Sequence, residues 1–363
     1  MAKKTSSRAD STASFGAGTA LADAGEAPAA KKRSSTTKAS TTKASTTKAG
    51  AAKKGATKKK AGRSAASSAE KGTSRKNAAK KRAAKKGAGK KKSGRGAKTK
   101  YTAKTADRHE LYQLSVQSPD ADVDFLVKTY RKLRGQKPTH LREDFCGTGY
   151  LMAEWLRRND ANTAEGYDID PDPVEWGKAR NFEGIEDPFE RAHFHLEDVR
   201  EPSRVAPQVR TAPNFSWMIF TDRPTLLSYF KAVHADLAAD GLFIFDIYGG
   251  FEAFEEMEET RRIPAGFTYV WDQVSYHPAT GDYHCRIHFR FKDGTKLKSA
   301  FDYRWRLWNL PEVVDIAREA GFSAVDSYWE GTDEDGESGN GEFKKHAKGE
   351  NCPAWVTYVV AQK

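Results

Sequence analysis

The sequence predicts an α/β fold, a mostly parallel sheet between layers of helices, preceded by a long basic tail. Three stretches carry this prediction. Residues 141–170 have the pattern of a strand, a glycine turn, a helix and a second strand. Residues 242–247 form an apolar run with Asp246 near its close, as in a parallel strand buried on both faces. Residues 267–308 indicate three antiparallel strands joined by hairpins, an insert within the α/β domain.

The tail, residues 1–104, differs sharply in composition from the rest. The first hundred residues hold 29 Lys and Arg against 4 Asp and Glu, and the remainder holds 32 against 45, so net charges of +25 and −13 give the total of +12. Having almost no large apolar residue, the tail cannot bury enough surface to offset the entropy of ordering, and we expect it to be disordered. It resembles the Lys- and Ala-rich tails of linker histones, which implies non-specific DNA association through phosphates. A merely solubilising extension is the alternative.

The sequence indicates a location inside the cell. No run of 18 apolar residues occurs, and residues 1–30 lack the apolar segment of a signal peptide. The three cysteines, Cys146, Cys285 and Cys352, form no CxxC pair, so neither a disulfide framework nor a metal site is expected. We therefore expect a cytoplasmic protein, with nucleoid association through its tail and no membrane partner.

The turn EDFCGTG follows the first predicted strand and discriminates between two cofactor classes. A dinucleotide site needs a third small residue where Met152 stands, and Glu143 ahead of the turn would repel a pyrophosphate. S-adenosylmethionine has no phosphate and carries an ammonium and a sulfonium, so an acid beside the turn is favourable. Asp168 stands 21 residues past Gly147, at the end of the second strand, where a carboxylate can accept from both ribose hydroxyls.

In these residues the chain resembles the class I S-adenosylmethionine-dependent methyltransferases, from about residue 107 to the C-terminus. The resemblance implies a Rossmann-like three-layer sandwich over residues 105–363, with a mostly parallel seven-stranded sheet and the 267–308 insert as a possible substrate cover. One departure is that Phe145 replaces the first glycine of the family's GxGxG turn. The resemblance further implies that Asp198 accepts a hydrogen bond from the adenine amino group and that the backbone N–H of Val199 contacts the adenine ring. It also implies that Asn214 lies beside the methionine end of the cofactor. The implied cofactor contacts are Glu143, Phe145, Cys146, Gly147, Gly149, Asp168, Ile169, Asp198, Val199 and Asn214.

The function that follows is methyl transfer from S-adenosylmethionine to a small-molecule acceptor. An amine acceptor needs no general base, and for a hydroxyl acceptor Tyr248 or His288 are the candidate catalytic residues. Because side chains alternate along a strand, basic residues such as Arg304 and Arg306 lie on one face of the insert. If that face covers the crevice, we expect an anionic acceptor; the alternative is that the face lies in water. Two alternatives remain: a nucleoid- or chromatin-binding protein with a non-catalytic cofactor-binding remnant, and a methyltransferase acting on nucleic acid or a DNA-bound protein.

Overall fold

The computed structural model describes residues 100–332 and 339–363. The predicted basic tail lies outside these residues except for its last few. Within those few, Tyr101 is already buried, and its ring centroid lies 5.4 Å from that of Phe267 in the insert. The packed chain therefore includes Tyr101, ahead of the boundary at residue 105 that composition suggested.

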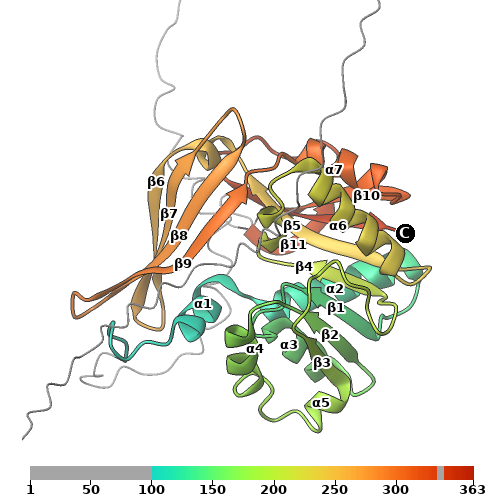
Figure 1. Ribbon diagram of the computed structural model, residues 1–363, viewed down its shortest axis with the longest axis horizontal. Coiled ribbons are helices and arrows are strands. Elements are labelled where there is room, and N and C mark those ends of the chain that lie inside the picture. Colours follow the sequence, from blue (N-terminus) through green and yellow to red (C-terminus); the bar gives the residue numbers. More distant parts are fainter. Residues whose placement is uncertain (1–99, 333–338) are drawn as a thin grey trace, which may run out of the picture. The chain divides into compact units, whose positions relative to one another are not determined.

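A mixed eight-stranded sheet forms the centre of the described domain (Figure 1). Its order is β11-β10-β12-β5-β4-β1-β2-β3, parallel from β5 to β3, with β12 antiparallel to β5. The strands are β1 (His140–Asp144), β2 (Thr163–Tyr167), β3 (Ala192–His195), β4 (Val209–Ala212), β5 (Leu242–Gly249), β10 (Ala324–Thr332), β11 (Gly339–Lys345) and β12 (Trp355–Gln362).

The eighth strand is the one difference from the predicted sheet. Residues 331–349, which are mostly polar and rich in Gly and acidic residues, contain β11. This strand lies at the edge of the sheet and pairs antiparallel with β10. Apart from Phe343, its side chains are polar or absent, because an edge strand needs little apolar surface and is protected from further pairing by charge.

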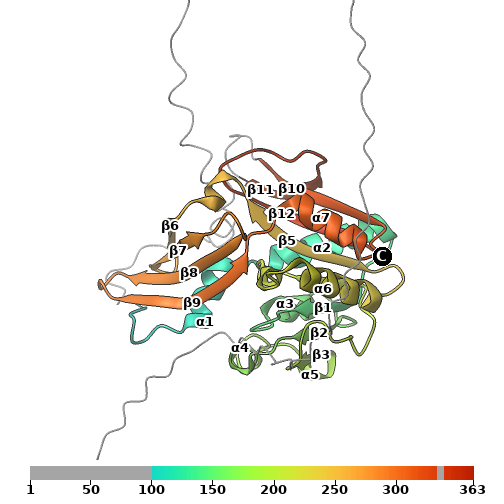
Figure 2. The same cartoon turned by 45° about the horizontal axis from the view of Figure 1, so that its top comes forward.

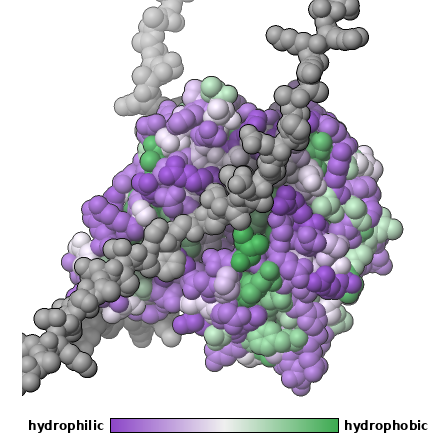
Figure 3. Space-filling view, viewed as in Figure 1, coloured by the Kyte–Doolittle hydropathy of each residue, from purple (hydrophilic) through white to green (hydrophobic). Residues whose placement is uncertain are grey.

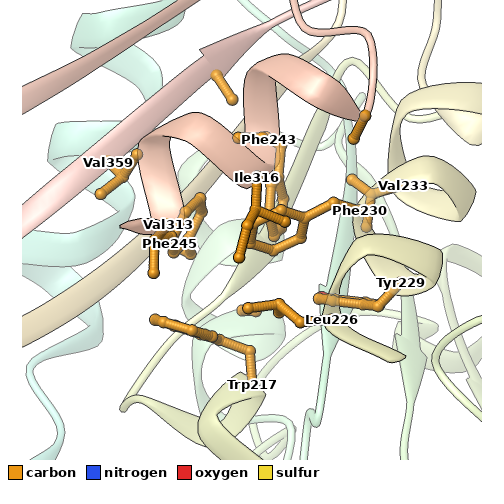
Figure 4. Packing of buried hydrophobic residues seen from close by; sticks show 14 of the residues in the cluster. Trp217, Leu226, Tyr229, Phe230, Val233, Phe243, Phe245, Val313, Ile316 and Val359 are labelled. Carbon is orange, nitrogen blue, oxygen red and sulfur yellow. The ribbon is translucent and has the colours of Figure 1, made fainter. Parts of the chain in front are cut away.

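Helices cover both faces of the sheet and complete the predicted three-layer sandwich. On one face, α2 (Pro119–Arg134), α3 (Tyr150–Arg158) and α4 (Pro171–Lys178) share a buried cluster with β1 and β5. On the other, α6 (Arg223–Asp236) and α7 (Leu310–Glu319) pack on β5 and β12, where Phe230 and Ile316 meet Phe243 and Phe245 (Figure 4). The short α5 (Pro188–Arg191) precedes β3.

The insert is a separate four-stranded antiparallel sheet (Figure 1, Figure 2). It contains β6 (Met257–Ile263), β7 (Phe267–Tyr276), β8 (Asp282–Phe291) and β9 (Lys296–Arg306). The last three match the predicted hairpins. β6, with the sequence MEETRRI, was not predicted, because it carries apolar side chains only at its two ends. The first helix, α1 (Arg108–Val116), packs on this sheet through Leu111, in one cluster with Phe267 and Phe289.

Candidate functional site

The turn after β1 places three residues in the left-handed region of the backbone: Phe145 (φ 56°), Gly147 (φ 49°) and Gly149 (φ 61°). Phe145 has a left-handed backbone, which residues with a side chain rarely adopt, and its ring packs against Phe220 and Tyr229. A Cβ on Gly147 would meet nothing within 4 Å, so the backbone there borders open space. A Cβ on Gly149 would lie 2.6 Å from the Phe194 ring, so this glycine is required for packing.

Asp168, at the end of β2, is joined directly to this turn. Its Oδ2 accepts from Gly147 N at 2.8 Å and its Oδ1 from Asp170 N at 2.9 Å. Burial raises the pKa of Asp168, and these backbone N–H groups oppose the shift. Each carboxylate oxygen has a second lone pair, so Asp168 can still accept from two ligand hydroxyls. The geometry joins the two sequence signals, the glycine turn and the acid, into one feature.

Glu143 and Cys146 lie beneath the turn. The Glu143 side chain is buried, its Oε2 accepts from Met152 N at 3.3 Å, and burial raises its pKa well above the usual value. Cys146 is also buried, and its N–H donates to the carbonyl of Tyr167 at 3.1 Å. Both residues therefore stabilise the turn through these buried hydrogen bonds.

The predicted adenine end has a different arrangement from the one expected. Arg200 binds both carboxylate oxygens of Asp198, at 2.9 and 2.7 Å, and this pairing lowers the pKa of Asp198. An adenine amino group would have to share Asp198 with that guanidinium. Val199 is buried, whereas Ile169, the residue after Asp168, is 62% exposed and offers an apolar surface for a ring. On the face shown in Figure 3, one group of apolar side chains lies near the centre, on a surface that is mostly hydrophilic.

A buried ionic network is centred on Asp144, the last residue of β1. Asp144 accepts from Arg142 Nε at 2.7 Å, from Arg210 Nε at 2.8 Å and from the Tyr229 hydroxyl at 2.7 Å. Arg210 also donates to Asp236 on α6 at 2.8 Å. The guanidiniums of Arg142 and Arg210 and the Asp144 carboxylate are fully buried. The network fixes β1 to β4 and α6, and it explains how a strand with the sequence HLRED can be buried along its whole length.

A cavity of about 280 Å³ lies beside the turn, between the main sheet and the inner face of the insert. Leu151, two residues after Gly149, is part of its wall. The main sheet contributes Thr211 and the end of β5, α1 contributes Tyr112, and the insert contributes aromatic residues. These insert residues are Tyr269, Trp271, Tyr303 and Trp305. The predicted substrate cover therefore borders a cavity on its aromatic face.

Asp246, in the wall of this cavity, is a site residue that our sequence analysis did not single out. Its carboxylate accepts from the backbone N–H groups of Asn214 (3.0 Å) and Phe215 (2.9 Å), and both donors have left-handed backbones. Burial raises its pKa to about 7; the two N–H groups oppose the shift, and Asp122 adds to it. A signal was present in the sequence, because a carboxylate interrupts the apolar run of 242–247 near its carboxyl end. Asn214 thus reaches the cavity wall and also positions Asp246 through its backbone.

The two predicted catalytic residues have different positions. Tyr248 lies in the cavity wall, and burial raises the pKa of its hydroxyl well above the usual value, so little of the deprotonated form that a general base needs is present at neutral pH. His288 is not in the wall. Its Nε2 lies 3.1 Å from Asp272, and its Nδ1 accepts from Ser299 N at 2.6 Å. The alternation of β8 turns Ile287 toward the cavity and His288 away from it, so His288 is not kept as a candidate.

The basic face of the insert also points away from the cavity, so the condition on which an anionic acceptor was predicted is not met. Ile287, Tyr303 and Trp305 line the cavity, and their neighbours along the strands face the opposite side. On that side, bases pair with acids of the same sheet, as in Arg286–Asp302 and Arg290–Glu258. Glu258, Asp272 and His288 bring possible ligand atoms within 4.8 Å of one another, but the first pairs with Arg290 and the other two with each other.

Comparisons with known proteins agree with this fold. No protein-family model and no curated protein sequence matches the chain. Among solved structures, an S-adenosylmethionine-dependent methyltransferase from Clostridium acetobutylicum aligns with a TM-score of 0.53 and 15% identity, over 70% of this chain and 96% of that protein. DesVI from Streptomyces venezuelae aligns with a TM-score of 0.51 and 14% identity, over 70% and 98%. The described domain therefore has the fold of the class I S-adenosylmethionine-dependent methyltransferases, as predicted.

Among the described helices, none combines the length and the hydrophobicity needed to cross a bilayer.

Proposed function

We propose that this chain is an S-adenosylmethionine-dependent methyltransferase that acts on a small molecule bound in the cavity. The observation that carries the proposal is the joined pair of Gly147 and Asp168. An open backbone turn and a carboxylate with free lone pairs stand together at the carboxyl edge of a parallel sheet, where ligands bind in open α/β folds. Leu151, which follows the turn at the start of α3, is part of the cavity wall, although neither Gly147 nor Asp168 lines the cavity.

The residues of the site fit this cofactor. Asp168 would hold the ribose hydroxyls, Ile169 would cover one face of the adenine, and Gly147 would allow close approach of the amino acid end. Glu143, buried beneath the turn, would favour the ammonium group. Asp198 would contribute after sharing its contacts with Arg200. When bound, the cofactor supplies an electrophilic methyl group on a sulfonium.

The contribution of the protein to the reaction would be positioning and exclusion of water. The sulfide that leaves needs no acid, so a general acid is not required. Trp271, Tyr303 and Trp305 give the insert side of the cavity an apolar wall. The helix α1 is held against the turn, because Gln113 donates to Thr148 Oγ1 at 2.8 Å. Holding two reactants in line in a water-poor cavity is a recognised source of large rate enhancement.

The proposal is tested by calorimetric titration of S-adenosylmethionine into the full-length protein. We expect binding by the parent and a 5- to 150-fold weaker affinity in Asp168→Asn, because stranding hydrogen-bonding groups costs about 1–3 kcal/mol. Asp315→Asn is the matched control, since its exposed carboxylate lies on α7, away from the cavity wall. A parent protein that does not bind the cofactor would refute the assignment.

For the N-terminal tail we propose non-specific DNA association, supported by its composition alone: dense Lys and Arg with no aromatic residue among the lysine clusters. It would keep a small-molecule enzyme near the nucleoid. The second candidate is a nucleoid-binding protein whose folded domain binds the cofactor without turnover. Truncation separates the two, because turnover by residues 100–363 would exclude the non-catalytic alternative.

A further inference from the structure

The wall of the cavity is acidic. Among its described residues, carboxylates come from five elements or loops, and Arg261 supplies the one guanidinium. That guanidinium is directed to the carbonyl of Ser115 and lies 5.4 Å from the Tyr269 ring. The carboxylates are Asp122, Asp246, Glu252, Glu259 and Glu330. Such a wall favours a positively charged ligand over an anion.

The wall is also aromatic, on the side formed by the insert. The rings of Tyr303 and Trp305 are stacked with centroids 4.5 Å apart, and the Trp271 ring lies about 6 Å from each of them, at 6.1 and 6.2 Å. Faces of Trp and Tyr rings attract ammonium groups through their quadrupoles, most strongly when the cation is desolvated. Aromatic rings on one side and carboxylates around them together are a recognition site for an organic cation.

Asp246 is the carboxylate best placed to receive that cation. It belongs to the rigid end of β5, and two backbone N–H groups and the neighbouring Trp217 fix it: Trp217 Nε1 donates to the Asp246 carbonyl at 2.8 Å. The two N–H groups leave one lone pair on each carboxylate oxygen. We propose that the acceptor is an amine that enters as an ammonium ion, and that Asp246 binds this ion and takes its proton. This inference rests on the methyl transfer proposed above.

The proton transfer gives the nitrogen the form that a methyl acceptor needs. One proton moves from the ammonium nitrogen to an Asp246 oxygen, which leaves a neutral amine with a free lone pair and a neutral carboxylic acid. A carboxyl whose pKa is raised to about 7 can exist in both forms at neutral pH, whereas an ordinary aspartate cannot. Tyr248 and Tyr303, which also line the cavity, stay protonated because burial raises their pKa values well above the usual range.

The test uses three probes of one shape and different charge: benzylamine, benzyl alcohol and benzoate. Binding to the full-length protein is followed by tryptophan fluorescence, since Trp271 and Trp305 line the cavity. We expect benzylamine, protonated at pH 7.5, to bind at least tenfold more tightly than the alcohol, and benzoate to bind most weakly. In Asp246→Asn the preference for benzylamine should fall to less than threefold, whereas Asp315→Asn should keep it.

Two readouts keep the inference separate from protein folding and from the proposed function. Thermal melting establishes whether Asp246→Asn folds. If this variant does not fold, the pH dependence of benzylamine binding to the parent protein tests the inference. That binding should strengthen between pH 6 and 8 with a midpoint near 7, because Asp246 ionises in this range. The other titratable or charged groups that face the cavity are the four further carboxylates and Arg261 named above, with the hydroxyls of Tyr112, Tyr248, Tyr269, Tyr303 and Tyr358. Absence of benzylamine binding, tighter binding of benzoate, or an unchanged preference in a folded Asp246→Asn would overturn the inference. Cofactor calorimetry reports separately on the methyltransferase assignment.

Discussion

Replacing Asp144 by Asn tests the buried ionic network that supports the cofactor turn. Asp144 is the common acceptor for Arg142, Arg210 and Tyr229, all fully buried. Asparagine has nearly the same volume, so the change removes the negative charge and one acceptor oxygen without opening a cavity. Two guanidiniums would then share Asp236 as their remaining carboxylate, at 2.8 Å from Arg210 and 3.4 Å from Arg142.

The expected loss of stability is about 3 kcal/mol, the lower end of the 3–5 kcal/mol for breaking a buried ion pair, because Asp236 still compensates part of the charge. For a domain of this size, 1 kcal/mol shifts the melting temperature by about 2–4 °C, so Asp144→Asn should melt roughly 6–12 °C below the parent. Differential scanning calorimetry on the full chain measures this shift.

The matched control is Asp315→Asn, which removes an exposed carboxylate 3.4 Å from Arg318 and should change stability by less than about 0.5 kcal/mol. If Asp144→Asn melts within 2 °C of that control, the network does not hold β1 to β4 and α6 as we argue. A loss of cofactor affinity in Asp144→Asn at a temperature where it is folded would show that the network also shapes the turn.

Three further predictions test other parts of the molecule. Gly177→Ala should destabilise the domain by about 1–3 kcal/mol in thermal melts, because the new Cβ would lie 1.9 Å from the Thr148 carbonyl oxygen, and this overpacking exceeds the gain of about 1 kcal/mol in helix propensity. With a turned-over amine, kcat/KM should rise with pH through about 7 as Asp246 loses its proton, and this limb should be missing in Asp246→Asn. The full chain should bind duplex DNA with a slope of log K on log salt near −5, if about six phosphates are neutralised; a protein lacking residues 1–99 should lose this binding, and equal binding by both would exclude the tail as the DNA contact.

The α/β sandwich was predictable because its signals are local. Helix starts such as Asp107 and Asp222 cap the helices that follow them, and an apolar run produced the central strand β5. The edge strand β11 and the first insert strand β6 were not predicted, since their charged sequences look like loops until a neighbouring strand pairs with them. Pairing partners distant in the chain are not encoded in local hydrophobicity.

The insert shows a second limit of sequence reasoning. Alternation correctly separated Tyr303 and Trp305 from Arg304 and Arg306, but it has no information on which face meets the main sheet. The structure turns the aromatic face inward, and Arg306 instead pairs with Glu312 and covers the Trp308 ring at 3.8 Å. The prediction of an anionic acceptor depended on that single choice of face.

Two residues at the end of β5 show why burial in one cavity can make a tyrosine unsuitable as a general base and an aspartate suitable. Asp246 and Tyr248 are two positions apart on one strand, both line the cavity, and both are desolvated. Desolvation disfavours the charged form of each group and therefore raises both pKa values. For a tyrosine the shift starts from about 10 and moves away from neutral pH, so the deprotonated form of Tyr248 that a general base needs becomes scarcer there. For an aspartate it starts from about 4 and moves toward neutral pH, so Asp246 gains the ability to exchange a proton there. Sequence reasoning favoured Tyr248 by residue type, whereas burial, which only the fold provides, favours the aspartate.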